Sequence, residues 1–96
     1  MNIALLLLIS YDLSTRDRPA AYEAIKATIE AASGGRCMRP LYSQWLVKTE
    51  ETIDTWVGRL QSHLSAADRL LILRVQGRTN GWLPNETWTW INARST

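Results

Sequence analysis

The stretch LLLLISYD at residues 5–12 is the feature that most constrains the fold of this chain. Apolar residues occupy both odd and even positions from Ile3 to Ile9, whereas a strand with one wet face alternates apolar and polar residues. The pattern predicts a strand in the middle of a sheet, buried on both faces, within a first element at residues 2–12. Because the run ends in Tyr11 and Asp12, a carboxylate is expected at the carboxyl end of this strand.

A helix is predicted next, because apolar residues recur at spacings of three and four: Tyr22, Ile25, Ile29 and Ala32. Asp17 is its expected N-cap, with Pro19 in the first turn, and Gly34-Gly35 is its expected end. Pro40 cannot donate to a strand ladder, so it is predicted to divide a short edge piece from a better strand at residues 42–48.

Thr49 is predicted to cap a second helix over residues 50–64, whose apolar face carries Ile53, Trp56, Val57, Leu60 and Leu64. A strand closed by Gly77 follows, and Pro84 is placed to start a short helix. This order predicts an α+β ferredoxin-like βαββαβ sandwich with a Trp-rich C-terminal helix. A chain of 96 residues is expected to form a single domain, with a core at about 1–77 and a helical tail at about 78–96.

Helices on one side of such a sheet leave its other face in need of a cover. The first strand offers apolar residues to that face as well, so either the Trp-rich tail or a second subunit is expected to lie over it. A two-fold homodimer is the commonest solution.

Composition sets limits on location and partners. Nine of the eleven basic residues are Arg, but the formal charge is only +2, far from the basic stripe of a dedicated nucleic-acid binder. Cys37 has no second cysteine to pair with, and the N-terminus lacks the features of a signal peptide. Its seven-residue apolar run is also too short to span a bilayer, which takes roughly twenty residues. We expect a soluble cytoplasmic protein without a membrane partner.

Asp12 is the main candidate for a chemical role, and two interpretations stay open. A carboxylate at the end of a central strand can hold Mg²⁺ or Mn²⁺ for phosphodiester chemistry. Alternatively, Asp12 caps a turn or the following helix. A two-fold interface would bring Asp12 from both chains together and supply the paired carboxylates that one chain lacks.

The remaining polar and aromatic candidates have weaker patterns. His63 is expected to lie on the surface or near a helix end, and the serines are not set in a nucleophile elbow, which argues against a serine hydrolase. The chain has no Phe but has five tryptophans: Trp45, Trp56, Trp82, Trp88 and Trp90. They could stack on nucleic-acid bases, but most of them are expected to pack in the core in place of Phe. Six arginines in predicted loops or strand ends could form a phosphate-binding surface or a solvated rim: Arg16, Arg18, Arg36, Arg39, Arg74 and Arg78.

The segments ISYDLS, YSQWLVKT, DRLLILRV and GWLPNETWTWIN resemble, in this order, those of a small CRISPR-associated adaptation protein family. The similarity is greatest to its SinR-like group, and VapD-type toxin ribonucleases are related. The resemblance implies a ferredoxin-like fold, a homodimer and a metal-binding, catalytic aspartate at the position of Asp12. Ser43 lies where the family has the serine of a Q-x-S-V-F segment, with Leu41 in place of the glutamine.

The resulting hypothesis is a divalent-metal-dependent endonuclease acting on RNA or DNA in antiviral defence or a toxin–antitoxin system. The Asp12 pair would hold Mg²⁺ or Mn²⁺, Arg16 or Arg18 would position phosphate, and Tyr11, Ser14 and Ser43 would support the site. The competing hypothesis is a non-catalytic dimeric scaffold, or a module that binds nucleic acid or a protein partner through Trp82, Trp88 and Trp90.

Overall fold

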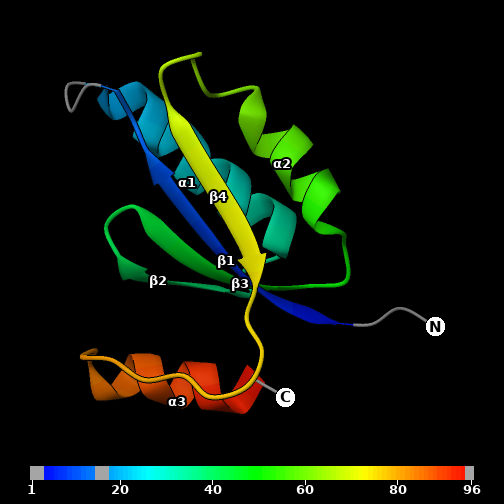
Figure 1. Ribbon diagram of the computed structural model, residues 1–96, viewed down its shortest axis with the longest axis vertical. Helices are drawn as coiled ribbons and strands as arrows, with labels where there is room; N and C mark the ends of the chain where they lie inside the picture. Colours follow the sequence, from blue (N-terminus) through cyan, green and yellow to red (C-terminus); the bar gives the residue numbers. More distant parts are fainter. Residues whose placement is uncertain (1–3, 15–17, 95–96) are drawn as a thin grey trace.

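The computed structural model describes residues 4–14 and 18–94 and shows a small, compact α+β arrangement. Four strands form one antiparallel sheet, and the chain also forms three helices (Figure 1). The elements are β1 (Leu5–Asp12), α1 (Pro19–Ser33), β2 (Cys37–Leu41), β3 (Gln44–Thr49), α2 (Ile53–Gln61), β4 (Arg69–Arg74) and α3 (Asn85–Arg94).

Strand β1 lies inside the sheet, as its two-sided apolar pattern predicted. The strand order is β2-β3-β1-β4, and β1 pairs antiparallel with both β3 and β4. Residue Leu7 faces Val47 on one side and Arg74 on the other, which sets the register of the whole sheet. The edges of the sheet are therefore β2 and β4.

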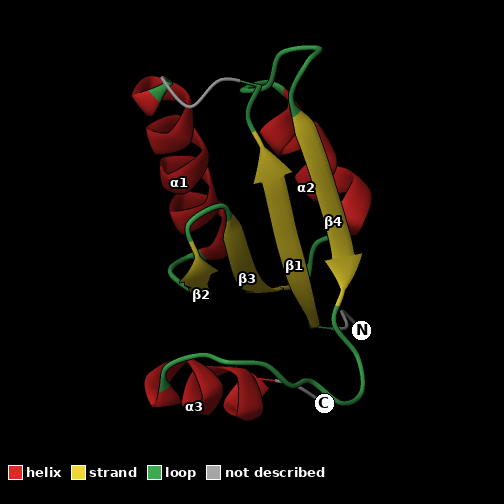
Figure 2. Cartoon of the chain, turned by 60° about the vertical axis from the view of Figure 1, so that its left-hand side comes forward, coloured by secondary structure: helices red, strands yellow, loops and turns green. Residues whose placement is uncertain are grey.

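Helices α1 and α2 cover one face of the sheet, whereas α3 lies apart from them, near the end at which β1 starts (Figures 1 and 2). The side chains of alternate β1 residues, Leu7, Ile9 and Tyr11, belong to the core beneath α1 and α2. Trp56 of α2 is completely buried there, and its indole Nε1 donates to Thr49 Oγ1 at 3.2 Å. Trp56 thus fills the role of a large apolar core residue while its one polar atom is satisfied.

The opposite face, called here the outer face, has a second and smaller core. Leu6 of β1 and Leu46 of β3 are buried against Ile91 of α3, with Trp88 and Trp90 packed around them. The C-terminal tail therefore covers part of this face, which was one of the two covers expected. Leu71 and Leu73 of β4 remain 58% and 40% exposed on it.

Several local signals are confirmed by the backbone. Gly34 ends α1 in a left-handed conformation with φ 62°, and the Gly35 N–H donates to the Glu30 carbonyl, as in a Schellman motif. Pro40 lies in an edge strand, as expected, at an irregularity in the pairing of β2 with β3. It does not divide the two strands, however: it lies inside β2, the turn falls at Tyr42 and Ser43, and β3 runs from Gln44 to Thr49 instead of over residues 42–48. Helix α3 begins at Asn85, directly after Pro84.

The predicted caps of the first two helices need revision. Thr49 ends β3 and does not cap α2; the N-cap is Thr52, whose hydroxyl accepts a hydrogen bond from the Thr55 N–H at 3.1 Å. Two threonines, Thr49 and Thr52, precede the helix, and the pairing of Thr49 with Leu5 keeps Thr49 in the sheet. Asp17 lies outside the described residues, and α1 has Arg18 at its N-cap without a side-chain cap.

The two tryptophans at the extremes of burial provide a matched stability test. Trp56→Ala is expected to lower the free energy of unfolding by about 3–5 kcal/mol, because it leaves a large cavity in the core. Trp82→Ala removes a side chain that is 100% exposed and should change the same quantity by less than about 0.5 kcal/mol. Urea unfolding followed by far-UV circular dichroism compares them. Equal effects would contradict the burial pattern.

Candidate functional site

Asp12 is the last residue of β1, and its side chain is exposed. It stands in a recess of about 320 Å³, lined also by Ser10, Tyr11, Ser43, Arg69, Leu70 and Leu71. Two interactions of the sheet place these residues together. Asp12 pairs with Arg69 in the β1–β4 register, and the Tyr11 N–H donates to the Ser43 carbonyl in the β2–β3 turn at 3.1 Å. Three of the residues expected at a site, Tyr11, Asp12 and Ser43, are therefore neighbours.

A second recess, of about 570 Å³, shares Asp12 and Ser43 with the first and is also lined by two tyrosines. The rings of Tyr22 and Tyr42 lie 5.2 Å apart, and the Arg39 guanidinium lies 4.5 Å from the centroid of the Tyr42 ring. Asp12 thus lies between a polar recess at the outer face and an aromatic recess that includes Tyr22 of α1. Planar or cationic groups of a ligand could contact these rings beside the carboxylate.

Tyr11 supports this end of the sheet from within the core. Its phenol accepts a hydrogen bond from Trp45 Nε1 at 3.1 Å, and the side chain is buried. Burial raises the pKa of Tyr11, and the hydrogen bond from Trp45 offsets part of that rise. Tyr11 is therefore a neutral packing residue whose backbone helps to place Asp12.

The structure assigns no capping role to Asp12 within the described ranges 4–14 and 18–94. Its carboxylate makes no hydrogen bond or ion pair to another described residue, although it is an acceptor for up to four. Nor do these residues contain a group of three or more His, Cys, Asp or Glu side chains arranged to hold a metal ion. One copy of the described chain offers a single open carboxylate, which by itself is an incomplete metal site.

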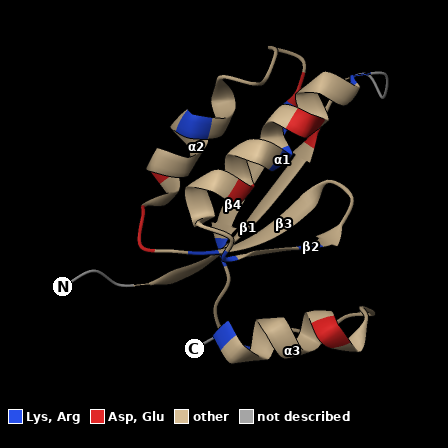
Figure 3. Cartoon of the chain, turned by 180° about the vertical axis from the view of Figure 1, so that it is seen from behind, with Lys and Arg blue, Asp and Glu red and all other residues tan. Residues whose placement is uncertain are grey.

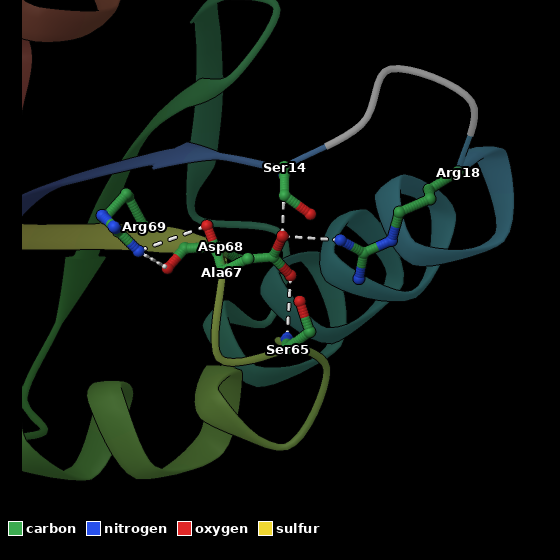
Figure 4. A network of polar contacts seen from close by, with 6 residues as sticks. All are labelled: Ser14, Arg18, Ser65, Ala67, Asp68 and Arg69. Atoms are coloured by element: carbon green, nitrogen blue, oxygen red, sulfur yellow. Dashed lines mark hydrogen bonds and ion pairs between the residues drawn. The ribbon is translucent and has the colours of Figure 1, made fainter.

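A different aspartate, Asp68, accepts hydrogen bonds from three described residues (Figure 4). Its Oδ1 accepts from the Ser14 N–H at 2.8 Å and from Arg18 Nη1 at 2.6 Å, and its Oδ2 accepts from the Ser65 N–H at 2.8 Å. The Asp68 side chain is fully buried. These donors, with the Arg18 ion pair first, hold the pKa of Asp68 well below its usual value.

This network ties the chain after β1 to the loop before β4. It explains the positions of two residues expected at the site, since the backbone of Ser14 and the guanidinium of Arg18 both bind Asp68. Arg16 lies outside the described residues. The phosphate-positioning roles of Arg16 and Arg18 stay predictions. Arg18 would have to bind phosphate while it is paired with Asp68.

Sequence reasoning did not single out Asp68 or Arg69. A signal for Asp68 was available, because Ser65 and Asp68 have the S-x-x-D spacing of a capping box, and the Asp68 carboxylate does accept from the Ser65 N–H. Arg69 has no such local signal. Its guanidinium Nη1 donates to the carbonyls of Ala67 and Asp68, and only the pairing of β4 with β1 brings it opposite Asp12.

The remaining titratable side chains do not form a second candidate site among the described residues. His63 Nε2 is hydrogen bonded to Thr28 Oγ1 at 2.9 Å, so it links the turn after α2 to α1. Lys and Arg residues are interleaved with acidic residues on the helices and strands (Figure 3). The helices of the described chain include none long and apolar enough to cross a membrane.

Comparison of the chain with models of known protein families, with curated proteins and with solved structures found no match. The geometry around Asp12 is therefore the basis for a functional proposal.

The Asp68 network predicts a specific acid sensitivity. Since the pKa of Asp68 is lower in the folded than in the unfolded chain, its contribution to stability is complete above its usual pKa of 3.8 and is lost as the pH falls below that value. We expect Asp68→Asn to lower the melting temperature by several degrees at pH 7, and by much less near pH 2. Thermal unfolding between pH 2 and pH 7 measures this difference.

Asp12→Asn is the matched control for this experiment. Its carboxylate is exposed and makes no hydrogen bond to a described residue, so the melting temperature of this variant should follow that of the wild type at every pH. Equal destabilisation by the two substitutions would contradict the special role of Asp68.

Proposed function

We propose that this protein is a cytoplasmic homodimer of two ferredoxin-like protomers with divalent-metal-dependent phosphodiesterase activity on RNA or DNA. The observation that carries the proposal is the open Asp12 carboxylate in a recess at the carboxyl end of central strand β1. The element order, the strand order β2-β3-β1-β4 and the placement of α1 and α2 on one face support the ferredoxin-like assignment. The proposal places the protein with the CRISPR-adaptation and VapD-type proteins that its sequence resembles.

The exposed apolar surface beside Asp12 supports a dimer. On the outer face, exposure increases along β1 from Leu6, which is buried under α3, through Leu8 and Ser10, which are half-buried, to Asp12, which is exposed. Leu71 pairs with Ser10 in the sheet and is 58% exposed. A second copy seated over Leu71 would remove this apolar side chain from water and bring the two Asp12 carboxylates toward one another.

Two Asp12 carboxylates would form the oxygen-rich site that one copy lacks. Mg²⁺ or Mn²⁺ bound there would activate water and neutralise charge on a phosphodiester. The chain's own contribution is positioning: the β1–β4 register places the Arg69 side chain opposite Asp12, where it can bind a phosphate oxygen. The hydroxyls of Ser10 and Ser43 line the same recess and can donate hydrogen bonds to the substrate.

A non-catalytic scaffold is the second candidate function. One observation favours it: a single described chain provides only one carboxylate at this recess. Metal-dependent cleavage would therefore need the carboxylate of a second copy.

Cleavage of end-labelled single- and double-stranded RNA and DNA tests the catalytic proposal. With Mg²⁺ or Mn²⁺ we expect cutting that EDTA abolishes and that Asp12→Asn slows by about 10²–10³-fold, because the substitution removes a charge from the metal site. Asp54→Asn, at an exposed position in the first turn of α2, is the matched control and should cut like the wild type. Equal activity of the Asp12 variant and the wild type would refute a catalytic role for Asp12.

Sedimentation velocity at several protein concentrations tests the dimer. Leu71→Glu is expected to shift the protein to monomer, because it places a charge on the apolar surface that the second copy would cover. Ala27→Glu, at an exposed position of α1, should leave the dimer intact. A wild-type protein that stays monomeric at all concentrations would remove the shared-carboxylate site.

A further inference from the structure

A groove of about 530 Å³ lies on the outer face, between the sheet and the C-terminal tail. Its floor includes Leu8, Leu46 and Leu73, and Trp88 and Ile91 of α3 form part of its wall. Neither Asp12 nor Leu71 lines it, so the groove is distinct from the recess and the dimer surface described above. The fold leaves this apolar groove open although α3 covers the neighbouring part of the same face.

The charge of the groove is one-sided. Arg74 at the end of β4 and Arg78 in the loop before α3 both line it, and its described lining contains no Asp, Glu or Lys. Arg74 pairs with Leu7 in the sheet, so its side chain starts from the face that α1 and α2 cover, and Arg78 is the guanidinium available to the groove. Among the described residues, Arg78 makes no ion pair with an acidic side chain. The groove is therefore complementary to a ligand that combines apolar groups with negative charge.

Trp82 lies on the rim of the groove and has no packing role in the fold. It is 100% exposed, whereas Trp45 and Trp56 are buried and Trp88 and Trp90 are packed against the outer-face core. Gly81, with φ 157° and Trp88 within 4 Å of the position of an added Cβ, brings the backbone close to α3 just before Trp82. The loop thus presents the indole beside the groove.

These features together match the centre of a protein–protein interface. Such centres are enriched in Trp and Arg and depleted in Lys, Glu and Asp, and the groove has two tryptophans and two arginines in its lining. The apolar side chains of the groove are mainly Leu, Ile and Val, which suit aliphatic or aromatic side chains of a peptide. Single-stranded nucleic acid is instead bound on stacked aromatic platforms in basic channels.

We propose that this groove binds an acidic, apolar peptide segment of a partner protein. One or two aliphatic or aromatic side chains of the segment lie against Leu8, Leu73 and Trp88, and the Trp82 indole covers them. Asp or Glu residues flanking these side chains pair with Arg78. The proposal does not depend on catalysis at Asp12.

A display library of random twelve-residue peptides provides the test. Selection on the wild-type protein is expected to enrich peptides with Asp or Glu beside aliphatic or aromatic residues. Trp82→Ala should lower the affinity for a labelled, selected peptide by about 5- to 30-fold, as expected for an interface hot spot. Trp82→Phe should restore most of this affinity. Fluorescence anisotropy measures both. The variant Arg78→Gln should weaken binding and make it less sensitive to salt.

Two controls keep the outcome specific to the groove. Arg36→Gln removes an exposed arginine outside the groove and should bind the peptide like the wild type. Asp12→Asn should also bind it like the wild type, so a failure of the phosphodiesterase proposal leaves this result unchanged. Far-UV circular dichroism confirms that each variant is folded.

Four results would overturn the proposal. The first two are a selection without enrichment above the unselected library and a selection that enriches basic peptides. The third is peptide binding that neither groove variant weakens. The fourth is displacement of the peptide by an equal concentration of a dT12 oligonucleotide, which would assign the groove to nucleic acid. Sedimentation of Trp82→Ala adds a fifth: a shift from dimer to monomer caused by this substitution would identify the occupant as a second copy.

Discussion

The two-sided burial of β1 is the constraint on which the rest of the structure depends. Its alternate residues Leu7 and Ile9 need α1 and α2 on one face, while Leu6 needs α3 on the other. Burying a Leu or Ile side chain is worth about 1.5–3 kcal/mol, so leaving either face uncovered would cost a large part of the stability of so small a domain. The tail is therefore part of the fold, and it covers the outer face only where β1 begins.

The incomplete cover on the outer face connects the fold to both proposed functions. Toward its carboxyl end, β1 carries Ser10 and Asp12 on that face, and the neighbouring Leu71 is open to solvent. Closer to α3, the same face forms the groove with Trp82 on its rim. A chain that closed this face completely would have neither an accessible carboxylate nor a groove, so stability and function compete for the same surface.

Local signals predicted those parts of the fold whose cause is local. Gly34 and Pro84 restrict the backbone at their own positions, and as expected Gly34 ends α1 and Pro84 directly precedes α3. Pro40 lies in an edge strand with irregular pairing, but it does not divide two strands, because the turn between β2 and β3 comes after Leu41. The prediction that Thr49 caps α2 was wrong because the residue type alone does not show that Thr49 is the last residue of β3. Arg69 was missed because its place opposite Asp12 arises from strand pairing between residues far apart in the chain.

By itself, the sequence determined that β1 lies inside the sheet and which faces of α1 and α2 are apolar, because burial sets the spacing of apolar residues along each element. It also singled out Asp12 as the carboxylate at the end of that strand. The tertiary structure decided that Asp68, and not Asp12, is the buried and hydrogen-bonded aspartate, and that Trp82 stays exposed while Trp56 is buried. These outcomes depend on contacts between segments distant in sequence, such as Ser14 with Asp68, whereas the local S-x-x-D spacing indicates only the hydrogen bond between Ser65 and Asp68.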